Sequence, residues 1–446
     1  MLDKLGTSFQ RPKNILILTI STTPFFILEN LEGYLAYLIV AFSISPIGLI
    51  TYLVIFGGFL VLQFAGIVFV NENARLLKSK SVVIEHLKKT IFVAQFALTI
   101  NLILILVQIF FLGKYSLISL YFPTFVGLVS ACILFFTFGF EFLKWRRNIR
   151  QSLGVLLFAF SFLLLGMVQF IDLPYLYFTM LHLPVIITPS TEIVPPLDIQ
   201  DKFLVFLIDN SVYVDYSAFA LMMFGTGLLL WQYSRKLNKA ALGLLIGIPL
   251  IGYFGADIEA FHISQLSAFT DGPYFLVFLS LTGIFSWLSH SFAFLYVARK
   301  VPQGSIKIFL NMTAIGFIFF SLSYTVDVSA GSYPPYSANS FSLFPISVLM
   351  VLFGIYGSAL SLSQDIILRK HVKLLARGDQ SLLSSIGTAH MENEVVRSIG
   401  NLKTLVDDEE SKLKDRSGLE TPMEDDEIKD YVAEIIAEFK NKRKNA

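Results

Sequence analysis

A Glu-x-x-His pair is the arrangement in this sequence best suited to hold a divalent metal ion. Glu259 and His262 are three residues apart, which places a carboxylate and an imidazole on one face of a helix. Asp257 precedes this pair, and His182 lies in the long outer loop predicted over residues 172–215. The sequence holds no second copy of the motif. These four residues therefore define a candidate site for a metal ion or a polar ligand.

A single histidine, His290, lies inside a hydrophobic run. Its imidazole could relay a proton, contact a ligand or bind haem, but haem held between helices needs a second histidine at similar depth, and the sequence has none. We predict that His290 forms a hydrogen bond to a neighbouring helix, as do Asn101 and Asn311. Glu141 is the one acid that we place inside a hydrophobic run, and we expect it to pair with Lys144.

Hydrophobic segments dominate the chain and must position these residues. Of the 446 residues, 55% are hydrophobic and 15% are charged, whereas a soluble globular protein carries about 25% charged residues. A helix needs about 20 apolar residues to cross a bilayer, and it satisfies its backbone hydrogen bonds internally. Ten runs suit such helices, near residues 14–30, 47–70, 91–113, 117–143, 152–171, 216–234, 240–256, 274–298, 304–325 and 343–364.

Positive charge is concentrated in every second gap between these runs. Four stretches hold fifteen lysines and arginines and only three acids: 71–90, 141–151, 235–239 and 299–307. The alternate gaps are acidic, and one of them is a long predicted outer loop over 172–215. Basic loops are retained in the cytoplasm, so the pattern predicts a multi-pass protein of the cell membrane with both termini cytoplasmic.

The N-terminal part of this topology has two interpretations. The first run follows Arg11 and Lys13 like the core of a signal peptide, but it lacks a small-residue cleavage site, so we interpret it as an uncleaved anchor. Alternatively, the first span starts nearer Leu31 and residues 14–28 lie in the inner interface of the membrane.

The composition changes after the last hydrophobic run. Residues 365–446 contain 31 charged residues, and we predict a cytoplasmic tail with helices near 365–406 and 422–443. The last helix begins with a capping box, Thr421-Pro422-Met423-Glu424. Apolar residues then recur at spacings of three and four, and such a short stripe must dock on another surface to be stable. This apolar face of the tail comprises Ile428, Tyr431, Val432, Ile435, Ile436 and Phe439.

The sequence indicates no enzyme class. It contains no phosphate-binding glycine loop, hydrolase motif or nucleic-acid-binding motif, and its one cysteine excludes a disulfide framework. His390 is not followed by the acid found after a phospho-accepting histidine, so kinase chemistry is not expected. We predict a non-enzymatic protein that needs no cofactor.

The predicted fold class is all-α: a polytopic membrane bundle of about ten helices over residues 1–364, followed by the tail. Such a protein could be a sensor or assembly protein, in which the bundle sets the state of the tail and the tail binds a cytoplasmic protein. Alternatively, it could be a carrier for a neutral or hydrophobic small molecule, because the predicted spans lack a buried carboxylate that would couple transport to ions.

The partners follow from the same observations. The lipid bilayer is a partner under both functions, and nucleic acid is not. The oligomeric state is open, because Gly243-x-x-x-Gly247 suits the close approach of a helix from the same bundle or from a second copy.

The predicted orientation can be tested by labelling in intact cells. With Cys132 replaced by serine, a cysteine introduced near Arg146 or Arg235 should not react with an impermeant maleimide added outside, because both arginines lie in gaps predicted to be cytoplasmic. It should react after the membrane is permeabilised. Reaction before permeabilisation would contradict the orientation.

Overall fold

The computed structural model describes residues 45–74, 82–148, 153–181, 185–188, 202–233, 239–255, 273–301, 304–324 and 333–364. All of them belong to the first of two compact units, Met1–Met391; the second unit is Glu392–Ala446. The predicted first span and both tail helices, with the apolar face of the tail, lie outside the described residues.

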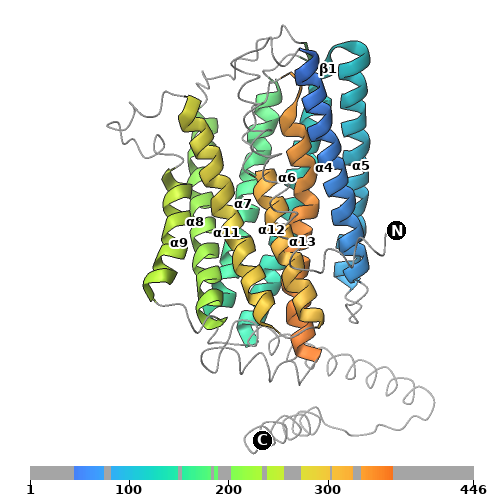
Figure 1. The fold of residues 1–446 in the computed structure, drawn as a ribbon. Coiled ribbons are helices and arrows are strands. Elements are labelled where there is room, and N and C mark those ends of the chain that lie inside the picture. The colour runs from blue at the N-terminus through green and yellow to red at the C-terminus, as the bar shows by residue number, and fades with distance from the viewer. Residues whose placement is uncertain are drawn as a thin grey trace, which may run out of the picture. The chain divides into compact units, whose positions relative to one another are not determined.

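The described residues are nearly all helical, and their helices run side by side (Figure 1). These helices are α4 (Pro46–Ala74), α5 (Val82–Leu112), α6 (Leu117–Asn148), α7 (Leu153–Leu181), α8 (Lys202–Tyr233), α9 (Lys239–Gly255), α11 (Pro273–Lys300), α12 (Ser305–Tyr324) and α13 (Tyr336–Gln364). Two short strands, β1 (Tyr115–Ser116) and β2 (Ile186–Ile187), pair antiparallel with Tyr115 opposite Ile187. Burial raises the pKa of Tyr115, whose ring stacks on Tyr333 just before α13.

Seven of the described helices are long and apolar enough to cross a membrane: α4, α5, α6, α7, α8, α12 and α13. α9 adds a shorter apolar stretch, Leu242–Phe254. The described residues therefore have the helical, multi-pass character that the sequence predicts. The count of ten spans stays a prediction, because it also requires residues 14–30 and complete crossings by α9 and α11.

The outside of the bundle is apolar, as expected for a surface that faces lipid. Phe111, Ile251 and Val93 are 82%, 74% and 70% exposed. Polar side chains such as Gln63 and Gln95 are instead buried. A water-soluble protein rarely exposes so much apolar surface, so this distribution supports a membrane location.

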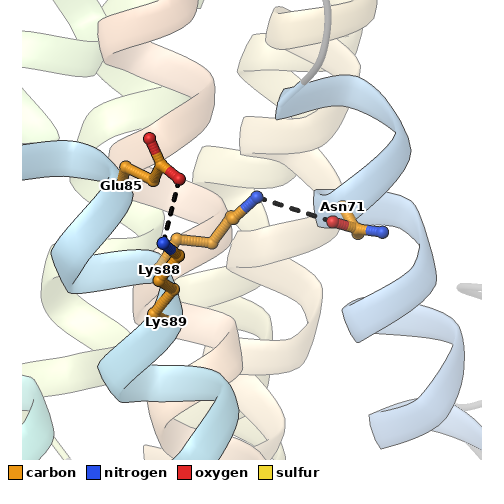
Figure 2. Close-up of polar contacts among 4 residues, drawn as sticks. All are labelled: Asn71, Glu85, Lys88 and Lys89. Carbon is orange, nitrogen blue, oxygen red and sulfur yellow. Dashed lines mark hydrogen bonds and ion pairs between the residues drawn. The ribbon is translucent and has the colours of Figure 1, made fainter. Parts of the chain in front are cut away.

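The helices alternate in direction, so the helix ends that flank the basic stretches of the sequence lie together (Figure 1). We call this the basic end and the opposite one the acidic end. At the basic end, Lys88 Nζ donates to Asn71 Oδ1 at 3.5 Å and links α5 to α4, while Lys89 pairs with Glu85 at 3.1 Å (Figure 2). The sorting of charge seen along the sequence is thus also a sorting in space.

The segment 172–215, which we expected to be a loop, is helical at both of its ends. α7 continues to Leu181 and α8 begins at Lys202. The neighbouring spans predicted from the sequence are 152–171 and 216–234, which leave Asp172 and Asp215 in the outer loop. The carboxylates of Asp172 and Asp215 are both hydrogen-bonded in the structure, so neither acid has to terminate its helix.

Among the seven candidate spans, α13 is the most enclosed. Its apolar window within Ala338–Leu362 is buried in full, whereas that of α5 is 33% buried. The helices α12, α6, α5 and α4 pack around it. The last of the seven candidate spans is therefore the central helix of this group.

The contact between α12 and α13 leaves no room for a side chain at its glycines. A Cβ atom added to Gly354 would lie 2.6 Å from the carbonyl oxygen of Phe309, and one added to Gly316 would lie 2.6 Å from the amide nitrogen of Val351. Close backbone approach of this kind replaces the hydrophobic effect as the source of helix association in lipid.

Replacing Gly354 by leucine should therefore destabilise the bundle. The added side chain would overlap the α12 backbone, and overpacking costs about 1–3 kcal/mol or more. The melting temperature of the detergent-solubilised protein measures the effect. Gly57→Leu in α4 is the matched control, because no atom lies within 4 Å of a Cβ added there. Equal melting temperatures for both variants would contradict the α12–α13 packing.

Candidate functional site

Two acids form hydrogen bonds between helices at the acidic end of the bundle. Ser211 Oγ of α8 donates to Asp172 Oδ1 of α7 at 2.9 Å. One helical turn further along α8, Asp215 Oδ2 accepts a hydrogen bond from the hydroxyl of Tyr253 in α9 at 2.5 Å. We call Asp172, Ser211, Asp215 and Tyr253 the acid seam. It joins α7, α8 and α9 through polar contacts.

The two carboxylates of the acid seam lie along the same side of α8. Ser211 and Asp215 are four residues apart and so lie on one face of this helix. Asp172 bonds to Ser211, so its carboxylate and that of Asp215 are both held along this face. Neighbouring carboxylates favour the binding of a proton or a cation, because either would reduce the repulsion between two negative charges.

Aromatic rings from three helices pack beside the acid seam. The Phe219 ring of α8 stacks on Tyr253, with 4.0 Å between their centroids. The indole of Trp287 in α11 meets the rings of Phe219 and Tyr253 edge to face, at 5.0 Å and 5.9 Å. These rings keep water from one side of Tyr253 and hold its hydroxyl toward Asp215.

His290 lies deeper in the same region and is completely buried. Its Nδ1 atom forms a hydrogen bond of 2.8 Å with Thr226 Oγ1, which links α11 to α8. The imidazole stacks on Phe317 of α12 and also contacts Trp287. Its Nε2 atom has no hydrogen-bond partner among the described residues. The hydrogen bond to a neighbouring helix that we expected from the sequence is present.

The other polar residues predicted within the spans are Asn101, Glu141 and Asn311. Asn101 Nδ2 donates to the carbonyl oxygen of Ser119 in α6 at 2.8 Å. Glu141 pairs with Lys144 at 2.6 Å, and with 36% of its side chain exposed it is not an isolated buried charge. Asn311 is buried in α12. The partners of Asn101 and Glu141 are thus not residues of the acid seam.

The candidate metal ligands Asp257, Glu259, His262 and His182 lie outside the described residues. Within the described ranges, no group of three or more histidine, cysteine, aspartate or glutamate side chains could hold a metal ion. The metal site therefore stays a prediction from the sequence.

The glycines of the Gly243-x-x-x-Gly247 motif do not pack against the described part of the bundle. No atom lies within 4 Å of a Cβ added to either glycine. α9 approaches α8 through a different contact, in which Ile246 fills the space above Gly227 of α8. The small residue that permits close approach is thus on the partner helix, and packing of this motif within the bundle is not observed.

Sequence analysis missed the acid seam because it placed both aspartates outside the spans. A usable signal was present in the stretch from Phe203 to Asp215, which is mostly apolar and contains neither glycine nor proline. Such a stretch is compatible with an early start of α8. The partner of Asp215 was not accessible in this way, since Tyr253 lies 38 residues away along the chain.

No protein-family model, curated protein or solved structure matches this chain. Its function must therefore be inferred from the chemistry of its own side chains.

Replacing Tyr253 by phenylalanine should weaken the acid seam and leave the aromatic packing in place. Loss of the hydrogen bond to a half-buried carboxylate costs about 1–3 kcal/mol in the free energy of unfolding. The melting temperature should fall, whereas Tyr177→Phe, at a ring that is 61% exposed, should leave it unchanged. A melting temperature that Tyr253→Phe does not lower would mean that this hydrogen bond contributes nothing to stability.

Proposed function

We propose that the protein is a membrane sensor or assembly protein in which α13 transmits the state of the bundle to the C-terminal segment 365–446. The observation that carries this proposal is the complete burial of the apolar window of α13 among α12, α6, α5 and α4. A helix with neighbours on all sides must respond when any of them shifts, because packed interfaces change between discrete arrangements.

The α12–α13 contact supports transmission along the chain. At Gly316 and Gly354 the backbones of α12 and α13 are in direct contact, with no room between them for an added carbon atom. A displacement of α12 would therefore move α13 with it. In the sequence, α13 leads at Asp365 into the basic stretch ILRKHVKLLAR, which begins the segment that would receive the movement.

The tail would pass the signal to a cytoplasmic protein. Its apolar face, Ile428 to Phe439 at helical spacing, is suited to lie in an apolar groove of a partner. The grouping of lysines and arginines at the basic end supports a cytoplasmic position for that end, and hence for the tail, in the cell membrane.

A carrier is the second candidate, and the acid seam favours it. We had expected a carrier without a buried carboxylate because no span was thought to contain an acid beyond Glu141. Asp172 and Asp215 lie within α7 and α8, where protonation or cation binding could be coupled to movement of these helices. If the protein is a carrier, its transport could therefore be coupled to protonation or cation binding at these two carboxylates.

The two functions can be separated in proteoliposomes and nanodiscs. Under the sensor proposal, Gly354→Ala should change the rate at which trypsin cleaves the tail of the folded protein several-fold, because the α12–α13 contact is altered. Gly57→Ala should not change it. Identical cleavage in both variants would contradict transmission through α13.

Under the carrier proposal, uptake of small molecules into proteoliposomes should survive deletion of residues 379–446 and should be lost in Asp215→Asn. Uptake that requires the tail, or that tolerates Asp215→Asn, would contradict a carboxylate-coupled carrier.

A further inference from the structure

A half-buried lysine lies at the basic end of the bundle, between α4 and α5. Lys88 is in the second turn of α5, and its Nζ atom points across to Asn71 near the end of α4 (Figure 2). The distance from Nζ to Asn71 Oδ1 is 3.5 Å, which is long for a hydrogen bond. The ring of Phe92 lies 5.9 Å from the same nitrogen. An amide and an aromatic ring therefore face this ammonium group.

No carboxylate neutralises Lys88 within the described part of the chain. The next lysine, Lys89, pairs with Glu85 at 3.1 Å, whereas Lys88 forms no ion pair with Glu85, Glu72 or any other described residue. Residues 75–81, which join the two helices in the sequence, add three basic residues and no acid. A partly buried charge that has no counter-charge favours the binding of an ion of opposite sign.

The surface beside Lys88 is apolar and faces outward. Further along α5, Val93 and Phe96 are 70% and 68% exposed, and α4 exposes Phe64 by 55%. Among the seven candidate spans, α5 is the one with the smallest buried share. A lysine at the end of such a surface lies at the depth where phospholipid headgroups meet their acyl chains, with its ammonium group toward the headgroups.

These surroundings define the chemistry of the anion. An ammonium group donates three hydrogen bonds, and Asn71 accepts one of them, so two remain for phosphate oxygens. A soluble phosphate would gain only this charge interaction, whereas a phospholipid also covers the apolar surface of α4 and α5. The basic residues in 75–81 favour a headgroup of net negative charge over one whose phosphate is balanced by its own cation.

We propose that Lys88 and Asn71 form a binding site for the phosphate of an anionic phospholipid, whose acyl chains lie on the exposed apolar surface of α4 and α5. The bound lipid would bridge these two helices at the basic end. The proposal depends on the membrane location of the bundle alone, so it holds for a sensor and for a carrier.

Native mass spectrometry of the full-length protein in detergent tests this proposal, with phosphatidylglycerol as the probe. Phosphatidylglycerol should bind about fivefold more tightly than phosphatidylcholine with the same acyl chains, which is the contribution of one lysine near an anionic surface. Glycerol 3-phosphate at the same concentration should not compete, because it has no acyl chains. Equal binding of the two lipids would overturn the proposal. Competition by glycerol 3-phosphate would also overturn it and assign the site to a soluble phosphate compound.

Three variants locate the binding within the protein. Lys88→Gln should abolish the preference for phosphatidylglycerol. Lys144→Gln is the matched control, because it removes the same charge at the basic end from a lysine that is already paired with Glu141. Asn71→Asp places a carboxylate beside Lys88 as an internal partner, so the protein should fold and the preference should again be lost. A preference that survives in Lys88→Gln or Asn71→Asp, or that falls equally in Lys144→Gln, would reject the site.

Discussion

Hydrocarbon offers no hydrogen-bond partner, and this constraint determines where every polar group of the bundle can lie. Backbone groups are satisfied within helices, and polar side chains are turned toward the seams between helices. The acid seam joins α7, α8 and α9, the His290–Thr226 bond joins α11 to α8, and the amides of Gln63 and Gln95 join α4 and α5 to Ser342 of α13. Each polar contact is also a connection between helices, so the same side chains give both cohesion and candidate chemistry.

The two polar regions belong to different groups of helices. The acid seam is built by α7, α8 and α9, whereas α13 is packed by α12, α6, α5 and α4 and shares its polar contacts with α4 and α5. The contacts of α6 with α7 and of α11 with α12 connect the groups. A change at the acid seam would therefore reach α13 through these intermediate helices, whereas a shift of α4 or α5 would act on α13 directly.

The helices were predictable from the sequence because hydrophobic length and alternating basic gaps are local signals. The seams were not, because they depend on residues far apart in the chain. Gln63 and Ser342 are 279 residues apart, and Ser211 and Asp172 are 39 apart. The aspartates also misled us, since charge alone suggests a loop until a partner is known. The sequence motif at Gly243 and Gly247 suggested a close helix contact at those glycines. The close contact between α9 and α8 is instead made by Ile246 of α9 against Gly227 of α8. The sequence predicted that His290 forms a hydrogen bond to a neighbouring helix, but it did not identify Thr226 as the partner.

The central position of α13 has a consequence for how the protein is made. Synthesis proceeds from the N-terminus, so α4, α5, α6 and α12 all enter the membrane before the helix that they surround. Until α13 arrives, the amides of Gln63 and Gln95 lack the Ser342 partner that they have in the finished bundle. The packing among the surrounding helices can therefore be completed only after α13 has been inserted between them.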